Sequence, residues 1–278
     1  MSEENKNEQG RIPMPKANFR VPANPASHVK KMVGVVSGKG GVGKSSVTGL
    51  CAMWSLRNGF RTAIMDCDIT GPSIPKMFGV TSEDIEVENV NPDGEGGTLV
   101  PAKTQTGIKV MSMNLLMEDE TQPVIWRGPV VAGVIKQFWT DVDWGDVDYM
   151  FVDMPPGTGD VPLTVFQSLP VDGIIIVTTP QDLVSMIVEK AVNMAKSMNV
   201  PILGMIENMS YVTCPHCGER IPIFGESHAQ EAAEKEDTRL IASLPINPAL
   251  AKAMDEGTFE YFEDFDLSGL TEALPALD

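Results

Sequence analysis

A glycine-rich loop between an apolar run and a helix-forming run constrains the fold of this chain more than any other feature. Residues 38–45 read GKGGVGKS, which fits the pattern G-x-x-x-x-G-K-S/T, and they join a strand expected over 32–37 to a helix expected over 44–57. Glycines let backbone N–H groups converge on phosphate oxygens, and the helix N-terminus adds a positive dipole. The sequence therefore predicts a phosphate site on a strand–loop–helix unit, with a glycine-rich turn without ligand as the simpler alternative.

The residues of this loop are expected to share the work of holding a nucleotide. Lys44 would reach the β and γ phosphates, and the Ser45 hydroxyl would bind Mg²⁺. The backbone of the remaining positions would surround the phosphates: Gly38, Lys39, Gly40, Gly41, Val42 and Gly43. A simple phosphate cradle does not require the charge of Lys39, so this lysine either has a further role or is an ordinary surface residue.

Apolar runs alternate with helical stretches along the rest of the 278-residue chain, which is typical of a mostly parallel sheet with helices on both faces. Strands are expected at 61–65, 147–152, 173–178, 201–206 and 239–242, helices at 130–140, 183–197 and 226–235, and an inserted hairpin region within 80–108. The prediction is a single α/β domain over 29–278. Residues 1–28, rich in polar side chains and proline, are expected to form a flexible tail.

Aspartates follow two of the expected strands and supply the rest of a nucleotide-hydrolysing site. Asp66 and Asp68 come after the strand 61–65, and Asp153 ends the strand 147–152. Because the carboxyl ends of parallel strands face one ligand crevice, these carboxylates are expected to meet the phosphate loop. Asp153 would hold Mg²⁺ through water, and Asp68 would position or activate the attacking water. Either group taken alone could equally be a solvated loop or a helix cap.

The loop that follows Asp153 reads MPPGTGD and resembles the switch segment that follows the magnesium-binding aspartate in nucleotide hydrolases. Gly157 in this loop can present its backbone N–H to the γ-phosphate. The sequence thus predicts that the second acidic strand and its loop contact the end of the nucleotide.

Only two of the four cysteines lie close together, Cys214 and Cys217 in a turn-rich loop near 211–220. A C-x-x-C pair offers two thiolates, whereas tetrahedral zinc and four-iron clusters both need four ligands. A symmetric dimer would complete the set, because the same loop from two chains gives four thiolates around one centre on the two-fold axis.

Other interpretations of the cysteines remain open. The pair could form a redox disulfide, or bind zinc with His216 or His228 as additional ligands. Cys51 and Cys67 are expected to pack in the core and in a loop, respectively, because a free cysteine behaves as a small hydrophobe.

The charge of the chain excludes several classes of partner. It has 21 Lys and Arg residues against 38 Asp and Glu residues, a formal charge of -17, which repels nucleic acids and anionic membranes. The longest strongly apolar run, 173–177, is too short to span a bilayer, and the first 27 residues lack the apolar part of a secretory signal. We therefore expect a cytoplasmic protein with no nucleic-acid and no membrane partner.

Taken in order, six segments resemble the Mrp group of P-loop ATPases, also called ApbC or Nbp-type iron–sulfur carriers, which share a deviant phosphate loop with MinD and ParA. The segments are GKGGVGKSS at 38–46, DCDITGPSIP at 66–75, WRGP at 126–129, DMPPGTGD at 153–160, ENMSY at 207–211 and CPHCG at 214–218. The resemblance implies an ATPase that forms a homodimer. The loop and carboxylates, without an obvious arginine finger, predict slow, Mg²⁺-dependent ATP hydrolysis. The resemblance also implies a bridging 4Fe-4S cluster on the paired C-x-x-C loops, which is handed to apo iron–sulfur client proteins.

The same resemblance assigns roles to residues whose chemistry alone does not reveal them. Lys39 matches the lysine that reaches across the dimer to the partner's nucleotide. Asn208 matches the asparagine that reads adenine, and Pro245 and Asn247 match a second segment on the base side.

Two alternatives to the carrier function come from different classes. One is a nucleotide-switched zinc protein that acts through binding and hydrolyses little ATP. The other is a positioning ATPase like ParA or MinD, which needs a basic surface or a basic terminal helix, whereas here no Lys or Arg follows Lys252.

Overall fold

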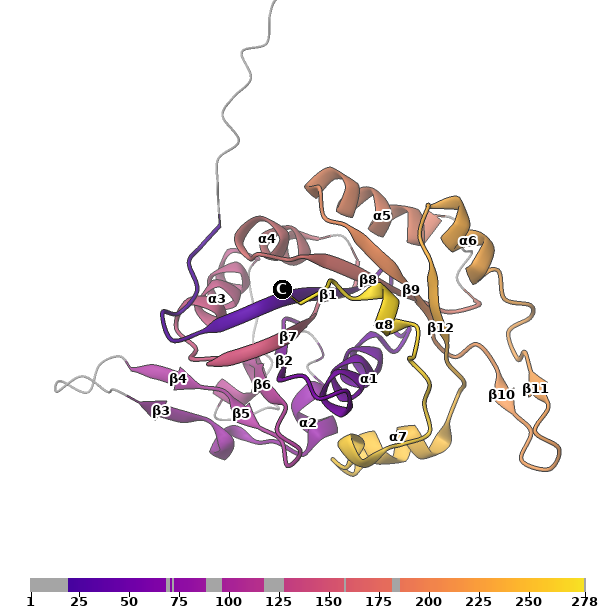
Figure 1. Ribbon diagram of the computed structural model, residues 1–278, viewed down its shortest axis with the longest axis horizontal. Coiled ribbons are helices and arrows are strands. Elements are labelled where there is room, and N and C mark those ends of the chain that lie inside the picture. The colour runs from indigo at the N-terminus through magenta and orange to yellow at the C-terminus, as the bar shows by residue number, and fades with distance from the viewer. Residues whose placement is uncertain are drawn as a thin grey trace, which may run out of the picture.

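One large β-sheet lies at the centre of the molecule, with helices on both of its faces (Figure 1). The computed structural model describes residues 20–277 except 69–70, 72, 89–96, 118–127, 158 and 182–185. The strands of the main sheet are β1 (His28–Ser37), β2 (Thr62–Asp66), β5 (Ala102–Lys103), β6 (Lys109–Ser112), β7 (Asp146–Asp153), β8 (Gly173–Thr178), β9 (Ile202–Glu207) and β12 (Leu240–Ser243). Their order is β12-β9-β8-β1-β7-β2-β6-β5, and only β5 and β6 pair antiparallel.

The predicted mostly parallel α/β fold is confirmed by this topology. Every residue of β2 and β8 is buried, which explains why these strands read as continuous apolar runs instead of alternating ones. Five expected strands match the structure to within one residue at each end, and β1 begins at His28, four residues earlier than expected. The short strands β5 and β6 lie outside the predicted set.

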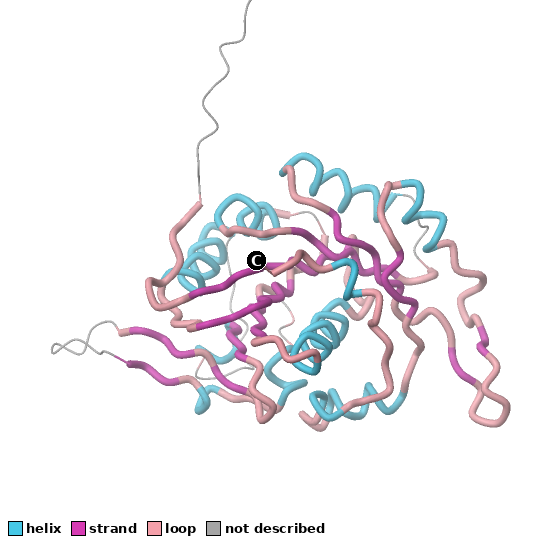
Figure 2. Tube along the Cα trace, viewed as in Figure 1, coloured by secondary structure: helices cyan, strands magenta, loops and turns pink. Residues whose placement is uncertain are grey.

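The helices form two layers that bury different sides of the strands (Figures 1 and 2). One layer contains α3 (Gly128–Thr140), α4 (Asp160–Ser168), α5 (Met186–Met198) and α6 (Ala229–Lys235), and the other contains α1 (Lys44–Arg57), α2 (Ile74–Phe78), α7 (Pro248–Asp255) and α8 (Leu270–Ala273). In β7, Met150 and Val152 belong to the first apolar core, whereas Tyr149 and Phe151 belong to the second. Successive side chains of a strand thus hold both layers to one sheet.

The remaining elements are short. Single 3-10 turns are η1 (Ser82–Asp84), η2 (Met113–Leu116) and η3 (Phe259–Tyr261). Two small antiparallel ribbons lie at opposite ends of the view in Figure 1, β3 (Glu86–Glu88) with β4 (Thr98–Val100), and β10 (Val212–Thr213) with β11 (Arg220–Ile221). The first ribbon agrees with the hairpin region expected within 80–108, although residues 89–96 lie outside the described residues. Among the helices of the described residues, none is both long and apolar enough to cross a membrane.

Residues 20–27 run along the domain and do not behave as the flexible tail expected over 1–28. The Val21 N–H donates to the Ser168 carbonyl at the end of α4 at 3.0 Å, and the Trp139 indole N–H donates to the Val21 carbonyl at 3.2 Å. The Asn24 N–H donates to the Trp139 carbonyl at 3.0 Å. These bonds hold a segment that has no regular secondary structure, so no periodic pattern in the sequence could predict its position; residues 1–19 lie outside the described residues.

Gly49 in α1 provides a test of how tightly this helix packs against the C-terminal segment. A Cβ atom at Gly49 would lie 2.5 Å from Phe259 Cε1 and 3.2 Å from Met77 Cε, and the Phe259 ring is fully buried. We expect Gly49→Ala to lower the free energy of unfolding, measured by urea denaturation, by about 1–3 kcal/mol because the core is overpacked.

Gly133 in α3 is the matched control, since a Cβ atom there meets nothing within 4 Å. Gly133→Ala should raise the free energy of unfolding by up to about 1 kcal/mol, the usual helix preference for alanine over glycine. Equal effects of the two substitutions would contradict the close contact between α1 and Phe259.

Candidate functional site

The glycine-rich loop leaves the end of β1 and enters α1, as the sequence predicts. Gly41 and Gly43 have φ angles of 79° and 75°, in the left-handed region that glycine adopts freely. At Gly43 a Cβ atom would also collide with the side-chain amide of Asn208. The loop borders a cavity of about 240 Å³ that is further lined by Asp68 and Met254. Glycine is therefore required at position 43 both for the turn and for the close approach of Asn208, which follows β9.

Asp153 at the end of β7 is the centre of the polar contacts under this loop. Its side chain is buried, and Lys44 Nζ lies 2.8 Å from its Oδ1 atom. The Ser45 hydroxyl donates to Asp153 Oδ2 at 2.6 Å, and the Thr48 hydroxyl donates to Oδ1 at 2.8 Å. The structure thus brings together Lys44, Ser45 and Asp153, the three residues predicted to bind phosphate and magnesium.

Thr48 is a member of this cluster that sequence reasoning missed. It lies one helical turn after Lys44 in α1, and its hydroxyl also contacts the Lys44 carbonyl at 3.0 Å. Its position four residues after the lysine, on the same face of a helix, was the available signal.

Asp68 and Asp66 complete a buried acidic group around Lys44. Asp68 Oδ2 lies 3.4 Å from Lys44 Nζ. Burial would lower the pKa of Lys44, but the charge and hydrogen bond of Asp153 and the charges of Asp68 and Asp66 together raise it, so the lysine stays protonated. The ammonium group of Lys44 thus lies among the carboxyl groups of three aspartates.

Asp66 differs from its neighbours because it is enclosed by protein groups. Burial first, and then the charge of Asp153, raises the pKa of Asp66 to about 8. The Asp68 N–H donates to Asp66 Oδ1 at 3.0 Å, and Asp66 Oδ2 lies 3.0 Å from the Ser112 hydroxyl. Asp66 therefore holds the backbone of Asp68, whose side chain faces the phosphate cavity.

The loop after Asp153 lies against the end of β1. The Gly157 N–H, expected to point to the γ-phosphate, donates to the Ser37 carbonyl at 2.9 Å, and Gly157 has a φ angle of 87°. Use of this N–H by a phosphate requires that the bond to Ser37 breaks. The neighbouring Thr158 lies outside the described residues.

Lys39 lies at the mouth of the same cavity, in line with the predicted loop. Its side chain is partly exposed, and its carbonyl accepts a hydrogen bond from the Ser37 hydroxyl at 2.9 Å. The proposed contact of Lys39 with a second chain stays a prediction.

The three residues expected to contact the adenine base lie at two different sites in the structure. Asn208 lies directly under the phosphate loop, where its side-chain amide donates to the Val42 carbonyl at 3.0 Å. Pro245 and Asn247 instead line a different cavity, of about 740 Å³. The Asn247 side chain caps α7 by accepting the Ala249 N–H at 2.9 Å, so it has a structural task that the sequence analysis missed.

The C-x-x-C pair occupies the tip of the hairpin formed by β10 and β11. The Cys214 N–H donates to the Glu219 carbonyl at 2.8 Å, and the Gly218 N–H returns to the Cys214 carbonyl at 2.9 Å. Cys217 is exposed, Cys214 is partly exposed, and the backbone N–H groups of Cys217 and His216 lower the pKa of the Cys214 thiol. A turn that directs N–H groups at sulfur favours thiolate, the form that binds metal.

The other two cysteines are shielded from solvent and ligands. Burial raises the pKa of the thiols of both Cys51 and Cys67, as expected for side chains that pack. Cys51 lies in the apolar core as predicted, whereas Cys67 also lies in the core and not in a loop contact. The correction follows from the position of Cys67 directly after β2, where its N–H donates to the Asp153 carbonyl at 2.9 Å.

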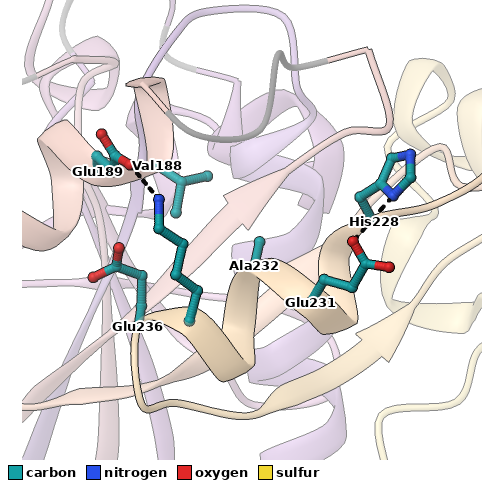
Figure 3. Close-up of a pocket in the computed structure, with 7 residues that line it drawn as sticks. Val188, Glu189, His228, Glu231, Ala232 and Glu236 are labelled. Carbon is teal, nitrogen blue, oxygen red and sulfur yellow. Dashed lines mark hydrogen bonds and ion pairs between the residues drawn. The ribbon is translucent and has the colours of Figure 1, made fainter.

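His228, considered above as a zinc ligand, lies in a pocket of about 190 Å³ between α5 and α6 (Figure 3). Its Nδ1 atom lies 3.3 Å from the Glu231 carboxylate, and at the other end of the pocket Lys235 contacts Glu189 at 2.6 Å. In the part of the chain that the structure describes, His, Cys, Asp and Glu side chains form no group of three or more with a metal-binding arrangement.

The fold and the loop together define a P-loop NTPase, and comparisons with known proteins give the family. Residues 28–274 match the family of ParA-type NUBPL iron-transfer P-loop NTPases. An iron–sulfur cluster carrier protein of Clostridium perfringens is 48% identical over 235 residues, which cover 84% of this chain and 82% of that protein. The chain therefore belongs to the NUBPL-type iron-transfer P-loop NTPases, and the predicted resemblance is confirmed.

Solved structures agree with this assignment. A nucleotide-binding protein of Archaeoglobus fulgidus, solved in complex with ADP, is 41% identical and superimposes with a TM-score of 0.76 over 90% of this chain and 93% of its own. The MinD cell division protein of Aquifex aeolicus has a TM-score of 0.53 over 82% of this chain and 87% of its own, at 17% identity, and so shares the fold.

The contact between Lys44 and Asp153 predicts a specific stability effect in the nucleotide-free protein. Lys44→Ala removes the cation next to a fully buried carboxylate, and we expect the free energy of unfolding to fall by about 3 kcal/mol. Adding Asp153→Asn removes the unpaired charge while preserving the shape. Urea denaturation should therefore find the double variant more stable than Lys44→Ala alone, and a further loss instead would show that the ion pair is not the cause.

Proposed function

We propose that this protein is an ATP-hydrolysing carrier that holds an iron–sulfur cluster as a homodimer and passes it to apo-proteins. The observation that carries the proposal is the exposed Cys214–Cys217 turn, which adds two accessible thiols to the fold of an iron-transfer NTPase. The carrier name of the Clostridium perfringens relative supports the same cargo.

The residues around the phosphate cavity fit a nucleotide with Mg²⁺. Lys44 would bind the phosphates, while Ser45 and Asp153, now in direct contact, would hold the cation. Magnesium supplies neutralisation of the negative charge that phosphoryl transfer develops. The solved ADP complex of the Archaeoglobus fulgidus relative supports a nucleotide at this loop.

Asp68 is the side chain that would orient the attacking water. It lies at the phosphate cavity, and Asp66 holds its backbone N–H at 3.0 Å, which limits where the carboxylate can move. Among the described residues that line this cavity there is no arginine, a group that strongly accelerates phosphoryl transfer elsewhere. We therefore expect ATP hydrolysis to be slow.

A short stretch of backbone connects the phosphate loop to the cysteine hairpin. Asn208 binds the Val42 carbonyl of the loop, and β10 begins four residues later at Val212. The Ser210 N–H donates to the Leu244 carbonyl and the Tyr211 carbonyl accepts the Ile246 N–H, each at 2.8 Å, so this stretch is held on its other side. A nucleotide that shifts the loop would thereby move the base of the hairpin.

This link supports a carrier in which nucleotide binding biases cluster loading or release. The nucleotide can shift the dimer from one state to the other only if it binds one of the two states more tightly. Each tenfold difference in affinity between the states shifts their free-energy difference by about 1.4 kcal/mol. Release itself is ligand exchange, in which thiolates of the acceptor replace those of Cys214 and Cys217 on iron. The oxidation state of the cluster does not change in this step. Two ligands from each chain make this exchange possible when the chains separate.

Lys39 is proposed to contact the nucleotide of the partner chain, and a mixing experiment tests this. Lys39→Ala should preserve the phosphate cradle of its own chain yet lower ATP turnover, because the contact that closes the dimer is missing. In heterodimers with Lys44→Ala chains, turnover should depend on which site carries which substitution. Turnover that only follows the mixing ratio would contradict a contact between subunits.

The cysteine pair gives the main test of the cargo. Cys214→Ser and Cys217→Ser should each abolish stable cluster binding after anaerobic reconstitution, because a serine oxygen is a much poorer iron ligand than thiolate. Iron and sulfide analysis with mass measurement should find about four irons per wild-type dimer. ATP binding should persist, since the phosphate loop follows β1 of the main sheet and the cysteines lie in a separate ribbon.

Cys51→Ser and Cys67→Ser are the controls, as both side chains are buried away from the hairpin, and their iron content should match that of the wild type. One zinc per chain would instead favour the zinc-binding interaction protein. A full cluster on a monomer would contradict the bridged carrier while leaving the NTPase assignment in place.

A further inference from the structure

The hairpin that presents the cysteine pair carries an exposed apolar surface, which we call the hairpin surface. It consists of Ile221, Ile223 and Phe224, whose exposed fractions are 46%, 54% and 36%. Every residue from 215 to 228 is exposed to solvent. Three large exposed apolar side chains within four consecutive residues favour an interaction site.

The contacts of the hairpin do not account for its stability. Its two strands have two residues each, paired Val212 with Ile221 and Thr213 with Arg220. A two-stranded ribbon without a covered face is marginally stable in water. At the base, the Arg220 guanidinium stacks on the Tyr211 ring at 4.6 Å, but the hairpin surface lies beyond this anchor. A second molecule that covers the hairpin surface would supply the missing burial.

We propose that the hairpin surface binds the hairpin of a second copy of this chain, and so forms the apolar part of the dimer interface around the cluster. This inference rests on the proposed function, in which Cys214 and Cys217 of two chains share one cluster. Both cysteines and Ile221 belong to the same ribbon, held by the bond from Cys214 N–H to the Glu219 carbonyl. A copy that brings its cysteines to a two-fold axis therefore brings its own hairpin surface with them.

The charge of the hairpin favours this occupant. The whole chain carries a formal charge of -17, so two copies repel each other over most of their surface. Residues 211–225 contain one acid, Glu219, and one base, Arg220, and their charges cancel. The hairpin is thus a neutral, apolar place where two acidic chains can meet.

The test measures dimerisation of the full chain after anaerobic cluster loading, by sedimentation equilibrium with iron analysis. Because the dimer is symmetric, Ile223→Asp places two charges in the interface, one from each copy. We expect each charge to raise the dissociation constant of the loaded dimer about tenfold, so about a hundredfold in total. Ile223→Val should keep wild-type dimerisation. Val87→Asp is the matched control, because Val87 is also 54% exposed but lies in β3 at the opposite end of Figure 1.

The outcomes separate this inference from the proposed function. ATP binding and thermal unfolding should be unchanged in Ile223→Asp, because the side chain is exposed. A loaded Ile223→Asp protein that dimerises like the wild type would overturn the inference alone. The inference would also be overturned if Ile223→Asp kept its dimer and its cluster but no longer passed the cluster to added apo-ferredoxin. That result would show that the hairpin surface binds the acceptor protein instead. A monomeric wild type with a full cluster would overturn both proposals.

Discussion

The contact between Lys44 and Asp153 holds the nucleotide site together. It joins the loop after β1 to the end of β7, and these neighbouring parallel strands bring Val35 and Asp153 into register. Both partners are removed from water, where a charge interaction is stronger than at the surface and where either charge alone would be costly. The geometry of the loop, the start of α1 and the acidic end of the sheet therefore depend on one another.

The sheet explains why the acidic residues gather around this pair. Asp66 and Asp153 lie opposite each other in the register of β2 and β7, so two carboxylates that are far apart in the sequence end side by side. Their proximity, together with burial, is what raises the pKa of Asp66, and Lys44 offsets part of the repulsion. A cation drawn into this site would find the remaining negative charge already in place, which is a form of preorganisation.

Much of this arrangement could be predicted from the sequence, because local signals and topology pointed the same way. The start of α1 follows from Gly43, whose left-handed backbone favours glycine, and from the apolar run before the loop. The grouping of Lys44, Ser45 and Asp153 follows from the rule that parallel strands end at one edge. Two hydrogen bonds escaped prediction for different reasons. The Asn247 cap is local and could have been found from the Asn-Pro pair at the start of α7. The backbone bond of Gly157 to Ser37 joins residues far apart in the sequence, and no sequence pattern indicates it.

Among the residues that the structure describes, the ribbon of β10 and β11 shares no strand pairing with the main sheet, although β10 begins five residues after the end of β9. The tip that carries the cysteines can therefore be changed without breaking any strand pairing of the main sheet. The cysteine pair and the phosphate loop thus lie in separate parts of the fold, and the bond of Asn208 to the Val42 carbonyl joins the loop to the chain segment that leads into the ribbon. Replacing the residues between Thr213 and Arg220 offers protein engineers a way to build a different metal centre on the same NTPase domain.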